Sequence, residues 1–335
     1  MTRTQKLGLC TWLPDDPVCL AEVNDNFSRL DASGGRSLTL AESAMVHLGG
    51  VMAAQAHQGG HAGYADRIMA DAFQDAAQLS SYDGVYYRGK RLELLAAGLS
   101  GGTVYGPNSA PGAGGAYSAS NVQRLVNVTQ SWSKLFDFQP EAYGQLTKLN
   151  FKTLDSGSTS VAIQAKLSIW DEQTNQMLLE TEMGSIVRSS KGIESVDYTV
   201  NYRLDPNRKY VMKLWVDSMP YSAVELLSIA FTVTPLVFET GSATMQAITV
   251  PAGTARAELL LHGTAAAAQV SLRFGTGEYT ALAASGSSAD ALPGGESCIL
   301  RRYAVDVPEG AQSAQLKLTL PGADCKVYDF ALVLL

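Results

Sequence analysis

The chain contains 335 residues, of which 46% are hydrophobic and 17% are charged. This composition is typical of a globular protein, and the length is enough for about two or three domains. The net charge of −7 argues against a general nucleic-acid binder. No apolar run reaches the roughly 18 residues of a transmembrane helix, and PDDP at 14–17 interrupts the run that a signal peptide needs. We therefore expect a protein made in a cytoplasm, without membrane insertion.

In the first segment, residues 1–35, the sequence pattern predicts a short helix that must pack on another surface. Asp16 can cap a helix whose first turn contains Pro17, and the sequence DASGG closes the segment. One apolar stripe at spacings of i, i+4 and i+7 follows the cap and comprises Val23, Phe27 and Leu30. A helix this short cannot form a core of its own. We expect it to dock on another part of the chain or on a partner.

Residues 36–98 predict a helical and then extended region, suited to oligomerisation or to a shaft. A helix rich in small residues fits 41–56, but its Gly49-Gly50 pair costs about 1 kcal/mol per glycine relative to alanine. The pair indicates either close packing between chains or a broken helix, and HQGGHAG at 57–63 indicates a flexible joint. A hairpin around the sequence RGK is then predicted by alternation of Val85, Tyr87, Leu92 and Leu94.

Two β units follow a Gly/Pro-rich linker or loop at 99–118. In the first unit, 119–235, strand-like runs are separated by turn sequences, and one run alternates strictly: Val161, Ile163, Ala165, Leu167 and Ile169. This pattern favours an antiparallel β-sandwich. We place the boundary at Pro235, because proline is poorly tolerated in a central strand. The short join predicts a stiff connection between the two units.

The second unit, 236–335, contains an internal echo. VPAGTARAELLL at 250–261 and VPEGAQSAQLKL at 307–318 both read Val-Pro-x-Gly, three residues, and then Ala-x-Leu-x-Leu. In each, a turn leads into an alternating strand, which favours a jelly-roll-like sandwich. The predicted fold class is mainly β: an N-terminal anchor with short helices, followed by two antiparallel β-sandwich domains.

The sequence contains no recognisable catalytic motif and implies no cofactor. FGTGEY at 274–279 is better explained as a hairpin turn than as a dinucleotide-binding loop. His57 and His61 have the i, i+4 spacing of a helical metal site, but Gly59 and Gly60 lie between them, so an exposed polar loop is the simpler interpretation. We expect no enzymatic activity, with a glycan hydrolase that uses two carboxylates as the remaining alternative.

Cysteines and aromatic residues supply the other candidates. The cysteine spacings match no zinc pattern. Cys298 and Cys325 could pair, but free buried thiols are favoured in a reducing compartment. Aromatic rings stack on the apolar faces of sugars, and ordinary core packing is the alternative for each ring. The candidate ligand-binding residues are Tyr86, Tyr87, Trp132 and Trp170.

The stretch LGLCTWLPDDPVCLAEVNDNFSRLD at 7–31 resembles the start of tail and fibre structural proteins of phages and prophages of Gram-positive bacteria. Those proteins begin with a Leu-rich strand, a Trp and an Asp-x-Pro-like turn. A helix with Asn-x-x-Phe-x-x-Leu/Ile-Asp follows, matched here by Asn24, Phe27, Leu30 and Asp31. DAFQDAAQLSSYDGVYY at 71–87 resembles a segment that precedes β domains in such proteins. Cys10 and Cys19 depart from the pattern, which has small or polar residues there.

The resemblance implies a virion protein made in the cytoplasm of a bacterial host. As a tail fibre, baseplate-associated or receptor-binding protein, it would form a homotrimer and present its β domains to host-surface glycans, with no nucleic acid as partner. Docking on other virion proteins would use Leu9, Trp12, Val23, Phe27 and Leu30. A head fibre or capsid decoration protein is the alternative, because the anchor does not identify its dock. A non-viral glycan-binding module is a second alternative, based on the internal echo.

Overall fold

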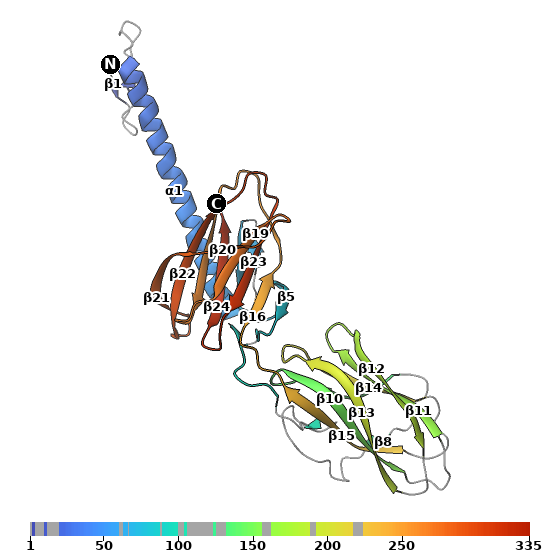
Figure 1. Ribbon diagram of the computed structural model, residues 1–335. Helices are drawn as coiled ribbons and strands as arrows, with labels where there is room; N and C mark the ends of the chain where they lie inside the picture. Colours follow the sequence, from blue (N-terminus) through green and yellow to red (C-terminus); the bar gives the residue numbers. More distant parts are fainter. Residues whose placement is uncertain are drawn as a thin grey trace.

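The computed structural model of the chain is mainly β, with antiparallel sheets and one helix near the N-terminus (Figure 1). It describes residues 2–3, 10–11, 20–59, 63–65, 67–87, 89–99, 104–105, 123–124, 132–155, 162–187, 192–216 and 224–335. Within these ranges every strand pair is antiparallel. The mainly β class that the sequence predicts is therefore confirmed.

The helix α1 (Leu20–Gly59) is continuous over 40 residues and follows a small ladder of β1 (Thr2–Arg3) and β2 (Cys10–Thr11). It passes through both Gly34-Gly35 and Gly49-Gly50. The helix end predicted at DASGG is therefore wrong, and so is the broken helix considered at the second pair. Figure 1 shows α1 projecting beyond the sheet that its C-terminal half touches.

The first β region forms two sheets, here called the inserted sheet pair. The orders are β13-β10-β15-β7, with β8 on β15, and β12-β11-β14-β9. The strands are β7 (Val104–Tyr105), β8 (Gln123–Arg124), β9 (Ser133–Phe138), β10 (Gly144–Asp155), β11 (Ala162–Asp171), β12 (Met177–Val187), β13 (Gly192–Leu204), β14 (Tyr210–Val216) and β15 (Val224–Pro235). Buried side chains of both sheets form one core, which includes Ala165, Leu167 and Ile169 of the alternating run. The last strand ends at Pro235, as the sequence predicts.

The remaining strands form two further sheets, here called the split sheet pair. The orders are β20-β19-β23-β16-β5, with β17 on β23, and β21-β22-β18-β24-β4-β3, with β6 on β24. The strands are β3 (Gly63–Ala65), β4 (Ile68–Asp71), β5 (Leu79–Asp83), β6 (Leu92–Glu93), β16 (Gly241–Met245), β17 (Ile248–Thr249), β18 (Arg256–Gly263), β19 (Gln269–Phe274), β20 (Thr280–Leu282), β21 (Ala284–Ala291), β22 (Ser297–Asp306), β23 (Ser313–Leu320) and β24 (Lys326–Leu334). Buried side chains of both sheets again form one core.

The internal echo of the sequence corresponds to β18 and β23, which lie in different sheets of the split sheet pair. Each strand is preceded by the same kind of turn. Gly253 has φ +79° and Gly310 has φ +76°, a left-handed conformation that glycine adopts without the steric cost of a Cβ. The repeated Pro-x-Gly sequence thus encodes a repeated local structure, one copy in each sheet.

Residues 63–93 belong to the split sheet pair, whereas the sequence places them in a separate region ahead of two successive β units. The strands β4 and β6 pair with β24, and β5 pairs with β16. Met69, Phe73 and Leu92 are buried in the same core as side chains from the C-terminal third of the chain. The hairpin predicted around RGK is confirmed, because Tyr86 and Glu93 exchange both backbone hydrogen bonds, at 2.8 and 2.9 Å.

The chain leaves the split sheet pair and returns to it at one place. The backbone N–H groups of Leu99 and Leu236 both donate to the carbonyl of Tyr143, at 2.8 and 3.3 Å. An ideal Cβ on Gly98 would lie 2.5 Å from the nitrogen of Leu236. The inserted sheet pair is therefore carried on two neighbouring stretches of chain.

A buried asparagine joins the two sheet pairs. Asn207, 4% exposed, donates through Nδ2 to the carbonyl of Val85 at 2.8 Å and accepts the N–H of Tyr87 at 3.1 Å. Beside it, the hydroxyl of Tyr82 donates to Asp205 Oδ2 at 2.7 Å. A buried side chain with satisfied polar atoms resists displacement, so we expect the junction to be stiff.

Candidate functional site

The C-terminal half of α1 packs on the outer face of the seven-stranded sheet, against β24, β4 and β18. The contact is close because small residues lie on both sides: an ideal Cβ on Gly49 would be 2.7 Å from Val333 Cγ2. Ala53, Ala70, Leu260 and Ala331 form the apolar centre of the contact. Over this half, the small residues that suggested packing between chains instead allow the helix to approach the chain's own sheet.

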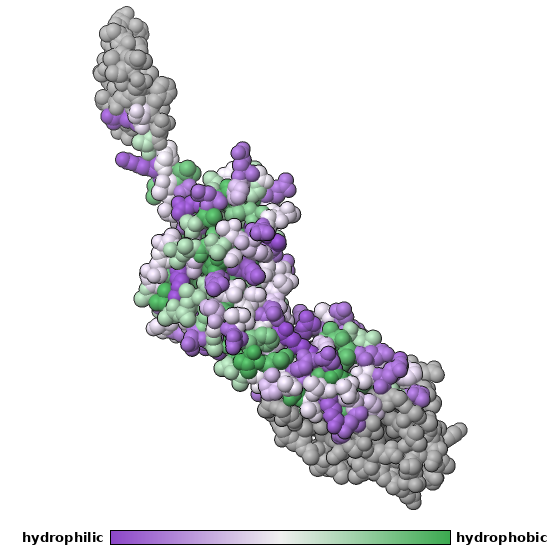
Figure 2. Space-filling model, in the orientation of Figure 1, coloured by the Kyte–Doolittle hydropathy of each residue, from purple (hydrophilic) through white to green (hydrophobic). Residues whose placement is uncertain are grey.

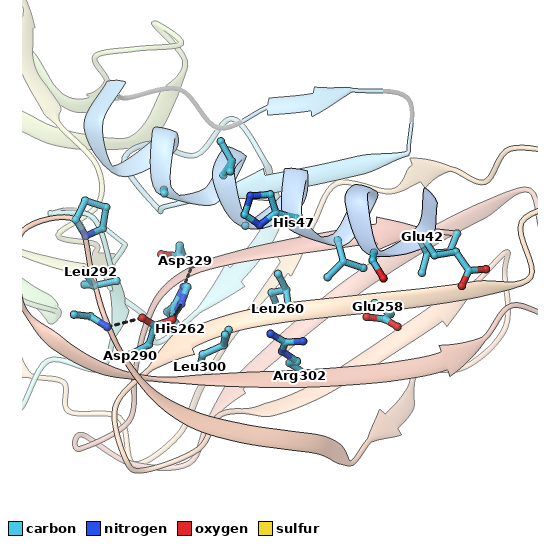
Figure 3. Close-up of a pocket in the computed structure, with 18 of the residues that line it drawn as sticks. Glu42, His47, Glu258, Leu260, His262, Asp290, Leu292, Leu300, Arg302 and Asp329 are labelled. Carbon is cyan, nitrogen blue, oxygen red and sulfur yellow. Dashed lines mark hydrogen bonds and ion pairs between the residues drawn. The ribbon is translucent and has the colours of Figure 1, made fainter. Parts of the chain in front are cut away.

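A chain of polar side chains holds the end of α1 on that sheet. Asp329 of β24 is 2% exposed and uses both carboxylate oxygens. Oδ2 lies 2.7 Å from His57 Nε2 of α1, and Oδ1 lies 2.7 Å from His262 Nδ1 of β18. The other ring nitrogen of His262 lies 3.3 Å from Asp290 Oδ2 of β21 (Figure 3). The four residues come from four different elements.

The pKa values of this group follow from its geometry. Burial lowers the pKa of His262, but hydrogen bonds and charge from Asp329, with smaller contributions from Asp290, raise it above its ordinary value. Burial alone would raise the pKa of Asp329, yet the hydrogen bonds of His262 and His57 lower it overall. His262 is therefore suited to be an imidazolium between two carboxylates. Because both ring nitrogens are engaged, it is not free to act as a general base.

A cleft of about 730 Å³ lies between α1 and the outer face of β18 and β22 (Figure 3). Leu260 and Leu300 form part of its floor, and Glu42 of α1 forms part of its rim. Arg302 lines the cleft from β22, and among the described residues neither Arg302 nor Glu42 has an ion-pair partner. The cleft thus offers a mixed apolar and charged surface.

The helix α1 exposes several large apolar side chains. Leu38 is 62% exposed, Leu40 72%, Leu48 49% and Val51 38%. Among the described residues, the only other large hydrophobic side chains with such exposure are Met177 and Val237. Exposed apolar surface therefore gathers on α1, and Figure 2 shows hydrophobic residues on the helix next to the split sheet pair. Clustered exposure of this kind marks a contact surface.

The structure places the docking residues predicted from the sequence only in part. Val23, Phe27 and Leu30 lie on α1, and their side chains are outside the description. Leu9 and Trp12 lie outside the described residues altogether. The predicted stripe therefore lies on the part of α1 that precedes the exposed apolar side chains, within the same helix.

The predicted aromatic ligand residues separate into two places. Trp132 and Trp170 lie together in the inserted sheet pair, with ring centroids 6.3 Å apart, and Lys213 Nζ lies 3.7 Å from the Trp170 ring. Tyr86 and Tyr87 belong to the split sheet pair. Tyr87 is 6% exposed and packs in the core, so its ring is not available to a surface ligand, contrary to its selection from the sequence.

The metal and cysteine predictions have different outcomes. His57 forms its short contact with Asp329, while His61 lies outside the described residues. The described part of the chain contains no group of three or more His, Cys, Asp or Glu side chains that could hold a metal ion. Cys298 and Cys325 are free and buried, as the sequence favours, and burial raises the pKa of each thiol to about 11.

Sequence reasoning missed the polar group around Asp329. His57 and Asp329 are 272 positions apart in the chain, and His262 is 67 positions from Asp329. The one available signal was a histidine within the apolar run AELLLHG and an aspartate within VYDFALVLL. A polar residue inside a strand-like apolar run indicates a buried hydrogen bond, but it does not identify the partner.

Among the described residues, no helix is both long and apolar enough to cross a membrane. Comparison with protein-family models found no match for the chain, and comparison with curated proteins also found none.

Proposed function

We propose that this protein is a structural protein of a phage tail: a fibre, baseplate-associated or receptor-binding protein. Its N-terminal segment docks on other virion proteins, and its two sheet pairs, as β-sandwiches of which the second is jelly-roll-like, face the host surface. The protein is made in the host cytoplasm, assembles as a homotrimer and becomes part of the virion. Its role is attachment rather than catalysis.

One observation supports this proposal more than any other. A 40-residue helix with exposed apolar side chains precedes two sheet pairs and projects beyond them (Figure 1). An apolar helix surface that the chain itself does not cover is suited to assembly, and the sheet pairs at the other end are suited to presentation. The resemblance of residues 7–31 to tail and fibre proteins agrees with this arrangement.

A host-surface glycan is the proposed ligand of the distal end. Trp132 and Trp170 form a paired aromatic surface, and Lys213 lies over the Trp170 ring. Such a surface can stack on sugar rings while the ammonium group contacts hydroxyls. The paired rings of Trp132 and Trp170 are equally consistent with a non-viral glycan-binding module, which would bind sugar without any virus particle.

A head fibre or capsid decoration protein is the second candidate, because a helix with exposed apolar residues does not identify its dock. Antibody labelling of purified particles distinguishes the two, since the signal lies on the tail in one case and on the head in the other. Absence of the protein from particles would contradict both.

The substitution Phe27→Asp tests docking. We expect the variant to be lost from particles while the sheet pairs stay folded, because an apolar contact that buries Phe27 would lose about 2–3 kcal/mol and would also bury a charge. Ser28→Asp is the matched control, because Ser28 is an exposed neighbour on the same helix. Incorporation is measured by quantifying the protein in purified particles. Equal incorporation of both variants would show that the dock lies elsewhere.

A further inference from the structure

We propose that the outer face of the six-stranded sheet of the split sheet pair binds a sugar that carries a carboxylate or phosphate group. The site, here called the cation site, comprises Arg273 of β19, Lys317 of β23 and Tyr279 of the turn between β19 and β20. The inference rests on the proposed function for its class of ligand, a glycan. It adds a second place of binding, in the other sheet pair, and the charge of the sugar.

The register of the sheet places both cations on the same face. Arg273 and Lys317 each follow a leucine that points into the core, so their own side chains lie on the outer face. Arg273 is opposite Gln315 in the neighbouring strand, and Lys317 is opposite Ser271. The two cations are therefore diagonal neighbours on adjacent strands. Such neighbours are about 7–8 Å apart, close enough for long side chains to contact one ligand.

Tyr279 and a buried amide hold the two cations in place. The ring centroid of Tyr279 lies 4.8 Å from Cζ of Arg273 and 5.7 Å from Nζ of Lys317, which is a cation–π arrangement. The Tyr279 hydroxyl donates to Oε1 of Gln315 at 2.8 Å, and a guanidinium N–H of Arg273 donates to the same oxygen. Gln315 is 9% exposed and donates to the carbonyl of Met245 at 2.8 Å. The site is thus arranged before any ligand binds.

The charge of the cation site is not neutralised by the chain itself. Among the described residues neither Arg273 nor Lys317 has an ion-pair partner, whereas Lys148, Lys166 and Lys326 each pair with a carboxylate. Nε of Arg273 is buried and has no hydrogen-bond partner. A guanidinium has five N–H donors, and this one uses a single hydrogen bond to a side-chain amide. It therefore has donors left for a carboxylate or phosphate, the anions that arginine binds best.

The surroundings of the cation site favour a sugar as the carrier of the anion. Ser271 lies beside Lys317 on one side, and Thr244 and then Ser81 lie on the other. This row crosses four adjacent strands and spans about 14 Å. Its hydroxyl groups both donate and accept hydrogen bonds, as sugar hydroxyls do. The net charge of −7 argues against a densely charged polyanion such as a nucleic acid.

Calorimetric titration of the intact protein with two matched pairs of sugars tests the inference. Tetragalacturonate is compared with neutral maltotetraose, and glucose 6-phosphate is compared with glucose. We expect the anionic member of at least one pair to bind about tenfold more tightly than its neutral partner, because it adds hydrogen bonds to charged groups. The first pair reports a carboxylate and the second a phosphate. Equal affinity within both pairs, or no binding in either, would overturn the inference.

The variant Lys317→Gln locates the binding. It removes one charge and breaks no hydrogen bond among the described residues, and we expect it to lower the affinity for the anionic sugar about tenfold. Arg302→Gln is the matched control, because Arg302 is an exposed cation without an ion-pair partner on the other sheet of the same pair. The control should bind the anionic sugar as the wild type does. Unchanged affinity of Lys317→Gln, or an equal loss in both variants, would show that the cation site does not hold the anion.

The same titrations separate this inference from the proposed function. A wild-type protein that binds maltotetraose and tetragalacturonate equally would retain glycan attachment, at the tryptophan pair, and lose the cation site. Conversely, a protein that prefers the anionic sugar through Lys317 but is missing from purified particles would contradict the proposed function and retain the cation site.

Discussion

Asp71 is a buried carboxyl with too few hydrogen-bond partners to offset the free-energy cost of burying its charge. It is 2% exposed, its Oδ1 accepts the N–H of Phe73 at 2.9 Å, and its Oδ2 has no hydrogen-bond partner. Burial is the main cause that raises its pKa from 3.8 to about 6. A carboxyl whose pKa is raised by folding destabilises the protein progressively as the pH rises from its unfolded-state value of about 3.8 to its folded value, and the full penalty holds above that.

We therefore expect Asp71→Asn to stabilise the protein at neutral pH. The amide oxygen can still accept the N–H of Phe73, and the charge is removed. The free energy of unfolding should rise by on the order of 1–3 kcal/mol at pH 7.5 and change little near pH 4, where Asp71 is protonated. Urea unfolding at the two pH values measures the difference. An equal effect at both would show that the charge is not its cause.

The pKa of His262 is also raised on folding, but its cause is attraction to two carboxylates rather than burial. Its pKa is raised in the folded state, so its stabilising contribution is complete below about pH 6.5 and is lost as the pH rises through the folded pKa. The lowered pKa of Asp329 adds stability that is complete above about pH 4 and is lost as the pH falls through the folded pKa. Both contributions are complete only between about pH 4 and about pH 6.5, so the group stabilises the fold most in this range.

We expect His262→Gln to reduce the free energy of unfolding by about 2 kcal/mol at pH 5.5, where hydrogen bonds to a charged partner are lost. The loss should be smaller at pH 9, because the charged form of wild-type His262 is less populated at the higher pH. Thermal unfolding at the two pH values gives the comparison. The exposed His47 is the control, and His47→Gln should change neither value. A larger loss at pH 9 would contradict the charged state assigned to His262.

At the scale of elements, α1 depends on where its glycines lie. Gly49 faces Val333 and Ala331 at distances that leave no room for a Cβ, whereas Gly35 has open space around it. The two glycines therefore have opposite roles in one helix: the first permits close packing on the sheet, and the second only weakens the helix.

Alanine substitutions should separate these roles. Gly49→Ala should lower the free energy of unfolding by about 1–3 kcal/mol, because the helix must move away from β24. Gly35→Ala should raise the stability of the helix by about 0.5–1 kcal/mol, since alanine has the higher helix propensity. Thermal unfolding followed by circular dichroism measures both. If Gly35→Ala were the more destabilising change, Gly35 would not have the open space around it that the structure shows.

At the scale of the whole molecule, the split sheet pair needs both ends of the chain. Because β4, β5 and β6 pair with β24 and β16, a cut in the Gly/Pro-rich stretch 99–118 should not release an independent C-terminal fragment. We expect limited proteolysis there to give two bands on a denaturing gel and one peak in native size-exclusion chromatography. A separate peak for a fragment of about 119–335 would contradict this pairing, and a first cut at 231–240 would contradict a stiff junction.

Much of the fold could be predicted where the signal is local. The hairpin at Tyr86 and Glu93 and the repeated Pro-x-Gly turns depend on residues close together in the chain, and periodicity reveals them. The end of β15 at Pro235 follows from the missing N–H of proline. Less of the candidate site could be predicted from the sequence. The apolar stripe of α1 was recognised only as far as Leu30, because DASGG is typical of a helix end.

By itself, the sequence determined the mainly β class and the positions of turns and strand runs, and it favoured free over paired thiols for Cys298 and Cys325. Each of these follows from local alternation, turn chemistry or composition. Only the tertiary structure decided that residues 63–93 complete the C-terminal sheets, that α1 continues through four glycines, and that Asp329 gathers His57 and His262. The reason is physical: a short apolar strand shows which face it buries but not its partner, which is chosen by the packing of a core whose parts are far apart in the chain.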